Sequence, residues 1–181
     1  KEKIILKKIL AFALTLVLLL AACPISLAKG TEESNTFDAV LLQKGTLIVQ
    51  ENLYFDTIKT TWRDIKMQTV TLINVATGSK LYALRLEHKA DRSTSIVSID
   101  IDEIDGVITT LKYIKAHINE LEDYSEIRYK TNSGLIVGAY YSSNKKQIFF
   151  EFKATDTEFI EIGEIDSLIS KFEAAKQKLG Q

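Results

Sequence analysis

The sequence predicts an α+β fold built from two tandem four-strand-plus-helix (ββββα) modules. In each module an antiparallel sheet is covered by a C-terminal helix, and the two modules form one pseudo-symmetric domain. Three observations predict this. Apolar residues alternate through eight short segments, they recur at helical spacing in two longer segments, and the second half of the chain repeats the first half. A period of two indicates half-buried strands, and a period near 3.6 indicates amphipathic helices.

The first 28 residues predict an export signal. Four lysines lie within the first eight residues, and the run from Ile9 to Ala22 carries no charge. A helix of that length rises only ~21 Å, which is short of the ~30 Å hydrocarbon core of a bilayer. A basic start, a short apolar run and small residues after it are typical of a signal peptide. We therefore expect an exported protein that is periplasmic, envelope-anchored or secreted.

Two cleavage sites are present in this signal, and both stay open. Leu20-Ala21-Ala22-Cys23 matches the lipobox of bacterial lipoproteins, which implies cleavage after Ala22 and acylation of Cys23. Ser26-Leu27-Ala28 matches the small-x-small pattern of ordinary signal peptidase, which implies cleavage after Ala28. Cys23 is thus the lipidation candidate, and membrane attachment is expected only through it. Because it is the only cysteine, no intramolecular disulfide can form.

The composition after the signal is that of a mildly acidic globular domain. Removing the signal takes away four lysines and one glutamate, which leaves 19 basic and 23 acidic side chains and a net charge of −4. Nucleic-acid and anionic-membrane binding need clustered Lys and Arg, so neither is expected. The remaining length is typical of one domain.

Residues 29–44 are predicted to form a polar leader and a short helix, with Thr36 as N-cap and Gly45 after the end. Residues 45–122 form the first module and residues 123–181 the second. In the first we expect strands near 46–57, 66–76, 80–88 and 95–101, and a helix at 102–121. In the second we expect strands near 124–131, 134–142, 146–154 and 157–162, and a helix at 163–179.

The duplication rests on two aligned stretches. From residue 99 to 116, seven of eighteen residues are identical to those found 61 positions later. Upstream, residues 78–87 match 144–153 at an offset of 66, and the polar loop 89–94 absorbs the difference. We therefore expect residues 66–88 with 95–116 to superpose on 132–154 with 156–177.

The order of these elements resembles that of the Whirly fold, which has two consecutive ββββα modules, and one module resembles the transcriptional positive-cofactor-four domain. Those families bind single-stranded DNA, but no Whirly motif is present, so no site residue is implied. The chain also resembles a group of exported bacterial proteins of unknown function. The shared features are an entry strand like Gly45–Ile48, a hairpin like 77–87 and an acidic helix start like 100–105.

An acidic cluster and two histidines are the polar candidates. Asp100, Asp102, Glu103 and Asp105 resemble a calcium loop at first, but the EF-hand template needs oxygen ligands at its fifth and twelfth positions, where Ile104 and Leu111 stand. We instead expect Asp102 to be a helix N-cap.

His88 and His117 are the only histidines, and catalytic and zinc sites usually need more converging partners, so we expect neither to be a metal ligand or a catalytic residue. No serine elbow or phosphate-binding glycine loop is present. The sequence therefore predicts no catalytic residue, no cofactor-binding residue and no metal ligand.

The aromatic side chains offer the one candidate binding surface. Several crowd the second module, and adjacent aromatics on a strand point to opposite faces, so some must lie off the core. Tyr140 and Phe149 are the candidates for a partner patch. We expect a non-enzymatic binding or structural module of the cell envelope, with an envelope protein or ligand as partner. The alternatives are a Whirly-like single-stranded nucleic-acid binder and an enzyme with a polar site.

Overall fold

The computed structural model describes residues 36–90 and 93–180, and these belong to one compact unit. The predictions for the signal peptide, for Cys23, for both cleavage sites and for most of the polar leader lie outside the described residues. Within the described part of the chain, no helix is both long enough and apolar enough to cross a membrane.

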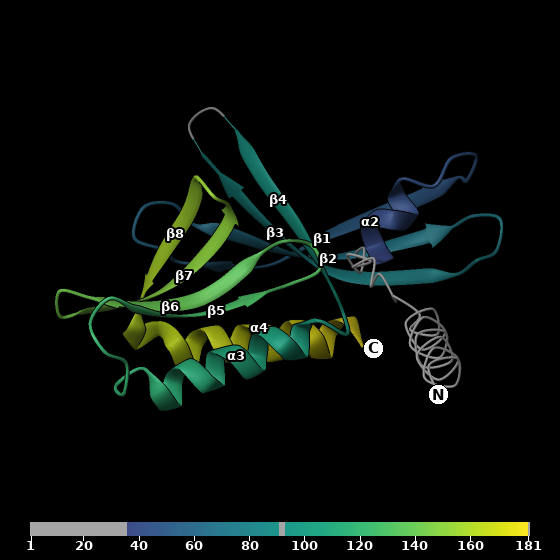
Figure 1. Ribbon diagram of the computed structural model, residues 1–181. Helices are drawn as coiled ribbons and strands as arrows, with labels where there is room; N and C mark the ends of the chain where they lie inside the picture. The colour runs from purple at the N-terminus through teal and green to yellow at the C-terminus, as the bar shows by residue number, and fades with distance from the viewer. Residues whose placement is uncertain (1–35, 91–92, 181) are drawn as a thin grey trace, which may run out of the picture. The chain divides into compact units, whose positions relative to one another are not determined.

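The structure confirms the α+β fold with two tandem ββββα modules (Figure 1). Each predicted strand and both long helices are present within a few residues of the expected ends. The elements are α2 (Thr36–Leu41), β1 (Ile48–Ile58), β2 (Ile65–Asn74), β3 (Lys80–Lys89), β4 (Thr94–Asp100), α3 (Ile104–His117), β5 (Ser125–Lys130), β6 (Ile136–Ser142), β7 (Lys145–Lys153), β8 (Asp156–Glu161), the 3-10 turn η1 (Ile162–Glu164) and α4 (Ile165–Leu179).

Both sheets are antiparallel meanders, ordered β1-β2-β3-β4 and β5-β6-β7-β8. The central hairpins of the two modules differ in length. Ser142 pairs with Lys145 across a two-residue turn, in which Ser143 and Asn144 both have positive φ, as tight hairpins require. The first module closes its hairpin less tightly, between Ile73 and Lys80. Because the two hairpins differ in length, equivalent strands of the two modules need not be separated by the same number of residues along the chain.

The register of β3 and β7 corrects one prediction. Ile99 of β4 pairs with Leu84, and its repeat mate Ile160 of β8 pairs with Ile148. Leu84 and Ile148 are thus equivalent, at an offset of 64 rather than the predicted 66. A shift of two residues keeps every side chain on its face, because side chains alternate with a period of two. The apolar pattern alone therefore could not distinguish the two registers.

Each sheet is covered by the helix of the other module. The helix α3 ends the first module and packs against β5 and β6, whereas α4 ends the second module and packs against β1, β2 and β3. The helices also pack against each other. Neither module could bury its own sheet with its own helix in this arrangement, so the two modules fold as one domain.

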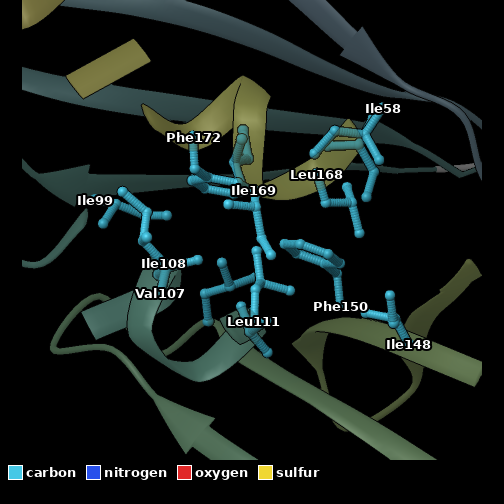
Figure 2. Close-up of a cluster of buried hydrophobic side chains, with 14 of the residues drawn as sticks. Ile58, Ile99, Val107, Ile108, Leu111, Ile148, Phe150, Leu168, Ile169 and Phe172 are labelled. Atoms are coloured by element: carbon cyan, nitrogen blue, oxygen red, sulfur yellow. The ribbon is translucent and has the colours of Figure 1, made fainter. Parts of the chain in front are cut away.

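The core lies between the two sheets and the two helices. Val107, Ile108 and Leu111 of α3 point toward Leu168 and Ile169 of α4 in Figure 2. The ring of Phe150 from β7 stacks on that of Phe172 from α4, with centroids 6.1 Å apart. Both helical stripes predicted from the sequence are buried, and they belong to a single continuous cluster.

The prediction of an N-cap at Asp102 is wrong. The N-cap of α3 is Glu103, which makes no side-chain capping bond, and the helix begins at Ile104. The carboxylate of Asp100 instead accepts hydrogen bonds from the backbone N–H groups of Thr36 (2.8 Å) and Phe37 (3.3 Å) at the start of α2. Capping patterns are local, whereas these bonds join residues more than sixty positions apart, which the local pattern could not reveal.

Candidate binding surface on the second sheet

The outer face of the second sheet is set by the alternation of its strands. On β7, the side chains of Ile148, Phe150 and Phe152 enter the core, which places Phe149 and Glu151 on the opposite face. The pairing of the four strands then brings one residue of each strand into a single cross-strand row. This row consists of Arg128 of β5, Gly138 of β6, Phe149 of β7 and Phe159 of β8.

Gly138 makes room for the ring of Phe149. A Cβ atom at this position would lie 2.5 Å from Cζ of Phe149 and 2.2 Å from the carbonyl oxygen of Ile127. The ring therefore lies over the backbone of β6, as aromatic side chains do over strand glycines. Phe149 is only 4% exposed although it faces outward. It forms the floor of this face rather than a projecting group.

Arg128 lies over this ring and is held by two carboxylates. Its guanidinium carbon lies 5.6 Å from the Phe149 ring centroid, within cation–π range. Its nitrogens lie 3.1 Å from Glu126 and 2.6 Å from Glu151. The hydrogen bond to Glu126 is the main cause that raises the pKa of Arg128 above its ordinary value. The local charge is thus one cation against two anions.

These side chains surround an open hollow of about 360 Å³, which we call the outer-face depression. Its lining consists of Glu126, Arg128, Tyr140, Phe149, Glu151, Thr157 and Phe159. The volume falls within the ~300–1,000 Å³ of small-molecule sites. The two residues predicted as a partner patch, Tyr140 and Phe149, are therefore brought together in one hollow.

The loop between β1 and β2 brings Trp62 to the edge of this surface. The backbone N–H of Thr61 donates to the carbonyl oxygen of Phe159 at 2.8 Å. The Trp62 ring meets the Phe159 ring edge to face, with centroids 5.6 Å apart. The ring centroids of Phe159 and Phe149 are 6.4 Å apart. Trp62 is 66% exposed, so it extends the aromatic surface beyond the sheet.

A largely buried cluster of polar side chains anchors that loop. His88 of β3 is 1% exposed, and its two ring nitrogens lie 2.9 Å from Asp156 and 2.8 Å from Glu158, both on β8. The second carboxylate oxygen of Glu158 accepts hydrogen bonds from the Thr60 hydroxyl (2.7 Å) and the Arg63 backbone N–H (3.3 Å). The cluster therefore joins the first sheet, the second sheet and the loop that carries Trp62.

The other polar residues considered in the sequence analysis contact neighbouring groups of the protein itself. His117 stacks on Tyr113 at 4.1 Å, and its Nδ1 lies 3.0 Å from the Tyr113 carbonyl oxygen. Glu103 accepts a hydrogen bond from the backbone N–H of Asn132 at 2.6 Å. Within residues 36–90 and 93–180, no three His, Cys, Asp or Glu side chains are arranged to hold a metal ion.

Sequence reasoning missed Arg128, Gly138 and the cluster around His88. A glycine inside the strand pattern of 134–142 was a usable signal for a close approach of a side chain to the backbone. No comparable signal marked His88, because its two carboxylates lie on a strand of the other module, far along the chain.

Comparison of the chain with protein-family models, with curated proteins and with solved structures found no match. The resemblance in element order to the Whirly fold, and the resemblance to exported bacterial proteins, therefore stay predictions.

Proposed function

We propose that this chain is an exported, non-enzymatic binding module of the cell envelope, and that the outer-face depression is its binding surface. The observation that carries the proposal is the cross-strand row from Arg128 to Phe159, continued by Trp62. The opposite face of the same sheet is filled by the core, whereas this face carries an aromatic floor, polar side chains and open space.

The two alternative functions, nucleic-acid binding and catalysis, need different arrangements of charged side chains. A single-stranded nucleic-acid binder would use the aromatic rings for base stacking and needs a positive groove for the phosphates. Here Glu126 and Glu151 already neutralise Arg128. An enzyme with a polar site would need its ionisable groups to meet substrate. Of the ionisable groups that converge at His88, His88 and Glu158 are buried and Asp156 is only 14% exposed.

Co-sedimentation with insoluble envelope fragments tests the proposal. We expect the purified protein to sediment with the fragments, and Tyr140→Ala to lower the bound fraction at least fivefold. Tyr113→Ala is the matched control, because Tyr113 is an exposed tyrosine on α3, away from the outer face. Equal binding by both variants, or no binding by the unmodified protein, would refute the proposed surface.

Two further measurements address export and the alternatives. The intact mass of the protein recovered from the envelope and from the medium distinguishes acylated Cys23 from cleavage after Ala28. Fluorescence anisotropy with a single-stranded oligonucleotide tests the rival directly, because binding through phosphates must weaken steeply with salt. Salt-sensitive binding that is lost in Tyr140→Ala would replace our proposal with the nucleic-acid function.

A further inference from the structure

We infer that the outer-face depression binds a neutral, polyhydroxylated ring, such as a sugar unit of an uncharged glycan. This inference rests on the proposed function and specifies its ligand class. It follows from three properties of the depression: its charge, its unused hydrogen-bond acceptors and its aromatic surfaces.

Charge excludes ionic ligands. An anionic ligand would meet Glu126 and Glu151, whose charges exceed that of the single cation beside them. A cationic ligand would seek the same two carboxylates and the Phe149 ring, and the Arg128 guanidinium already occupies that position. A neutral ligand meets neither repulsion nor this internal competitor.

Hydrogen bonding favours a ligand rich in donors. A carboxylate only accepts hydrogen bonds, and its two oxygens offer about four lone-pair directions. One oxygen of Glu126 and one of Glu151 bind Arg128, which leaves further acceptor positions on each carboxylate. The hydroxyls of Tyr140 and Thr157 line the same hollow. Hydroxyl groups on a ligand can donate to these acceptors from several directions.

The aromatic surfaces supply the apolar contact. A sugar ring presents C–H groups on its face and hydroxyls around its edge, which matches an aromatic surface surrounded by acceptors. Phe159 is half-buried in the depression, and Trp62 stands nearly perpendicular to it, with an interplanar angle of 88°. Two ring planes at right angles therefore lie at this edge of the depression, and the exposed Trp62 side chain offers surface on which a sugar ring can pack.

Titration of intrinsic fluorescence tests this inference, because Trp62 is the only tryptophan in the chain. Cellohexaose, chitohexaose and maltohexaose are the neutral probes, and an oligothymidylate is the anionic probe. We expect at least one hexasaccharide to shift or quench the emission with saturation, and the oligothymidylate to leave it unchanged. Isothermal titration calorimetry should give the same affinity.

Variants locate the site. Phe159→Ala should weaken saccharide binding at least tenfold, and Tyr113→Ala should leave it unchanged. If Phe159→Ala does not fold, Trp62→Ala read by calorimetry replaces it, because the exposed Trp62 side chain is not part of the core. Saccharide binding that survives both Trp62→Ala and Tyr140→Ala would overturn the inference.

The two proposals fail in distinguishable ways. Envelope co-sedimentation that depends on Tyr140, with no response to any hexasaccharide, would overturn the ligand class and leave the binding surface intact. Loss of both would overturn both. Binding of the oligothymidylate at the same site would overturn the argument from charge.

Discussion

Lys112 of α3 and Glu173 of α4 occupy the same position in the two modules, 61 residues apart, and they form an ion pair with each other at 2.7 Å. On either side, Asp105 pairs with Lys176 and the repeat mates Asp166 and Lys115 pair with each other, both at 2.5 Å. Reciprocal contacts of this kind mark an isologous interface around a two-fold axis. The two modules therefore meet as the protomers of a symmetric dimer would.

His88 and Phe152 repeat this relationship inside the protein. Each lies four residues after an equivalent position, Leu84 or Ile148, and their rings stack with centroids 5.5 Å apart. In a true homodimer both contacts would bring identical side chains together. Placing both modules in one chain allows the paired positions to differ, so that a cation meets an anion and a histidine meets a phenylalanine.

The helix-to-helix ion pair should depend on charge complementarity and not on side-chain identity. Lys112→Glu should destabilise the protein because it places two carboxylates opposite each other. The effect should be at most about 1 kcal/mol, since both side chains are roughly half exposed. The double variant K112E/E173K should recover stability in urea unfolding. Strictly additive losses in the double-mutant cycle would contradict the pairing.

The equivalent core residues Ile108 and Ile169 should both be needed for stability. Each is buried on the inner stripe of its helix. Truncation to alanine should cost roughly 2–5 kcal/mol in the free energy of unfolding. Thr109→Ala, on the exposed side of α3, is the control and should change it by less than about 0.5 kcal/mol. A loss below ~1 kcal/mol at either isoleucine would show that its site can repack.

Gly138 should not accept a side chain. Gly138→Ala would place a methyl group against both the Ile127 carbonyl oxygen and the Phe149 ring, so the strand or the ring must shift. Overpacking of this kind costs typically about 1–3 kcal/mol. Gly163→Ala is the control, because a Cβ there meets nothing within 4 Å. Equal stability of the two variants in a thermal melt would argue against the packing of Phe149 over β6.

His88 should hold the Trp62 loop as well as the two sheets. His88→Ala leaves Asp156 and Glu158 without the imidazole between them, and removal of one hydrogen-bond partner from a buried polar group costs roughly 1–3 kcal/mol. At temperatures where the variant is still folded, Trp62 emission should shift to the red as the loop loosens. The matched control His117→Ala should leave the emission unchanged. Unaltered emission in His88→Ala would show that the loop is held by other contacts.

The contact of the Asp100 carboxyl, at the end of β4, with the start of α2 should make the free energy of unfolding depend on pH. Burial is the main cause that raises the pKa of Asp100 above its ordinary 3.8, and the nearby Asp102 carboxylate raises it further. Near and above pH 3.8, Asp100 is therefore protonated in a larger fraction of folded molecules than of unfolded ones. The contribution of Asp100 to stability must then decrease as pH rises from 3.8 through the raised pKa.

Asp100→Asn should flatten this part of the profile, because asparagine does not titrate. Its single amide oxygen can accept from only one of the Thr36 and Phe37 N–H groups, which bond different oxygens of Asp100, so the whole profile should also lie lower. Unfolding free energies measured at closely spaced pH values would detect the change. Asp102→Asn should alter stability at pH 7 by less than about 0.5 kcal/mol, because Asp102 is exposed and does not cap α3. A steeper loss of stability with rising pH in Asp100→Asn would contradict a raised pKa at Asp100.

The sequence by itself determined the elements, their order and the duplication. Alternation on strands such as β7 and the apolar stripes through Ile108 and Ile169 are local consequences of backbone geometry, so they are visible in one dimension. The same alternation indicated that an aromatic such as Phe149 must leave the core. The local pattern could not identify the neighbours of Phe149 on adjacent strands. Arg128 and Gly138 come close to Phe149 only because β5, β6 and β7 pair in this register.

Only the tertiary structure decided the register, the exchange of helices and the buried cluster. Registers that differ by two residues present the same faces, so the offset of β3 and β7 depends on the hairpin lengths. Either helix could have covered either sheet, since both stripes are apolar. His88 meets Asp156 and Glu158 because the two sheets adjoin there. Contacts between residues far apart in sequence depend on how whole elements pack, and no local pattern encodes that choice.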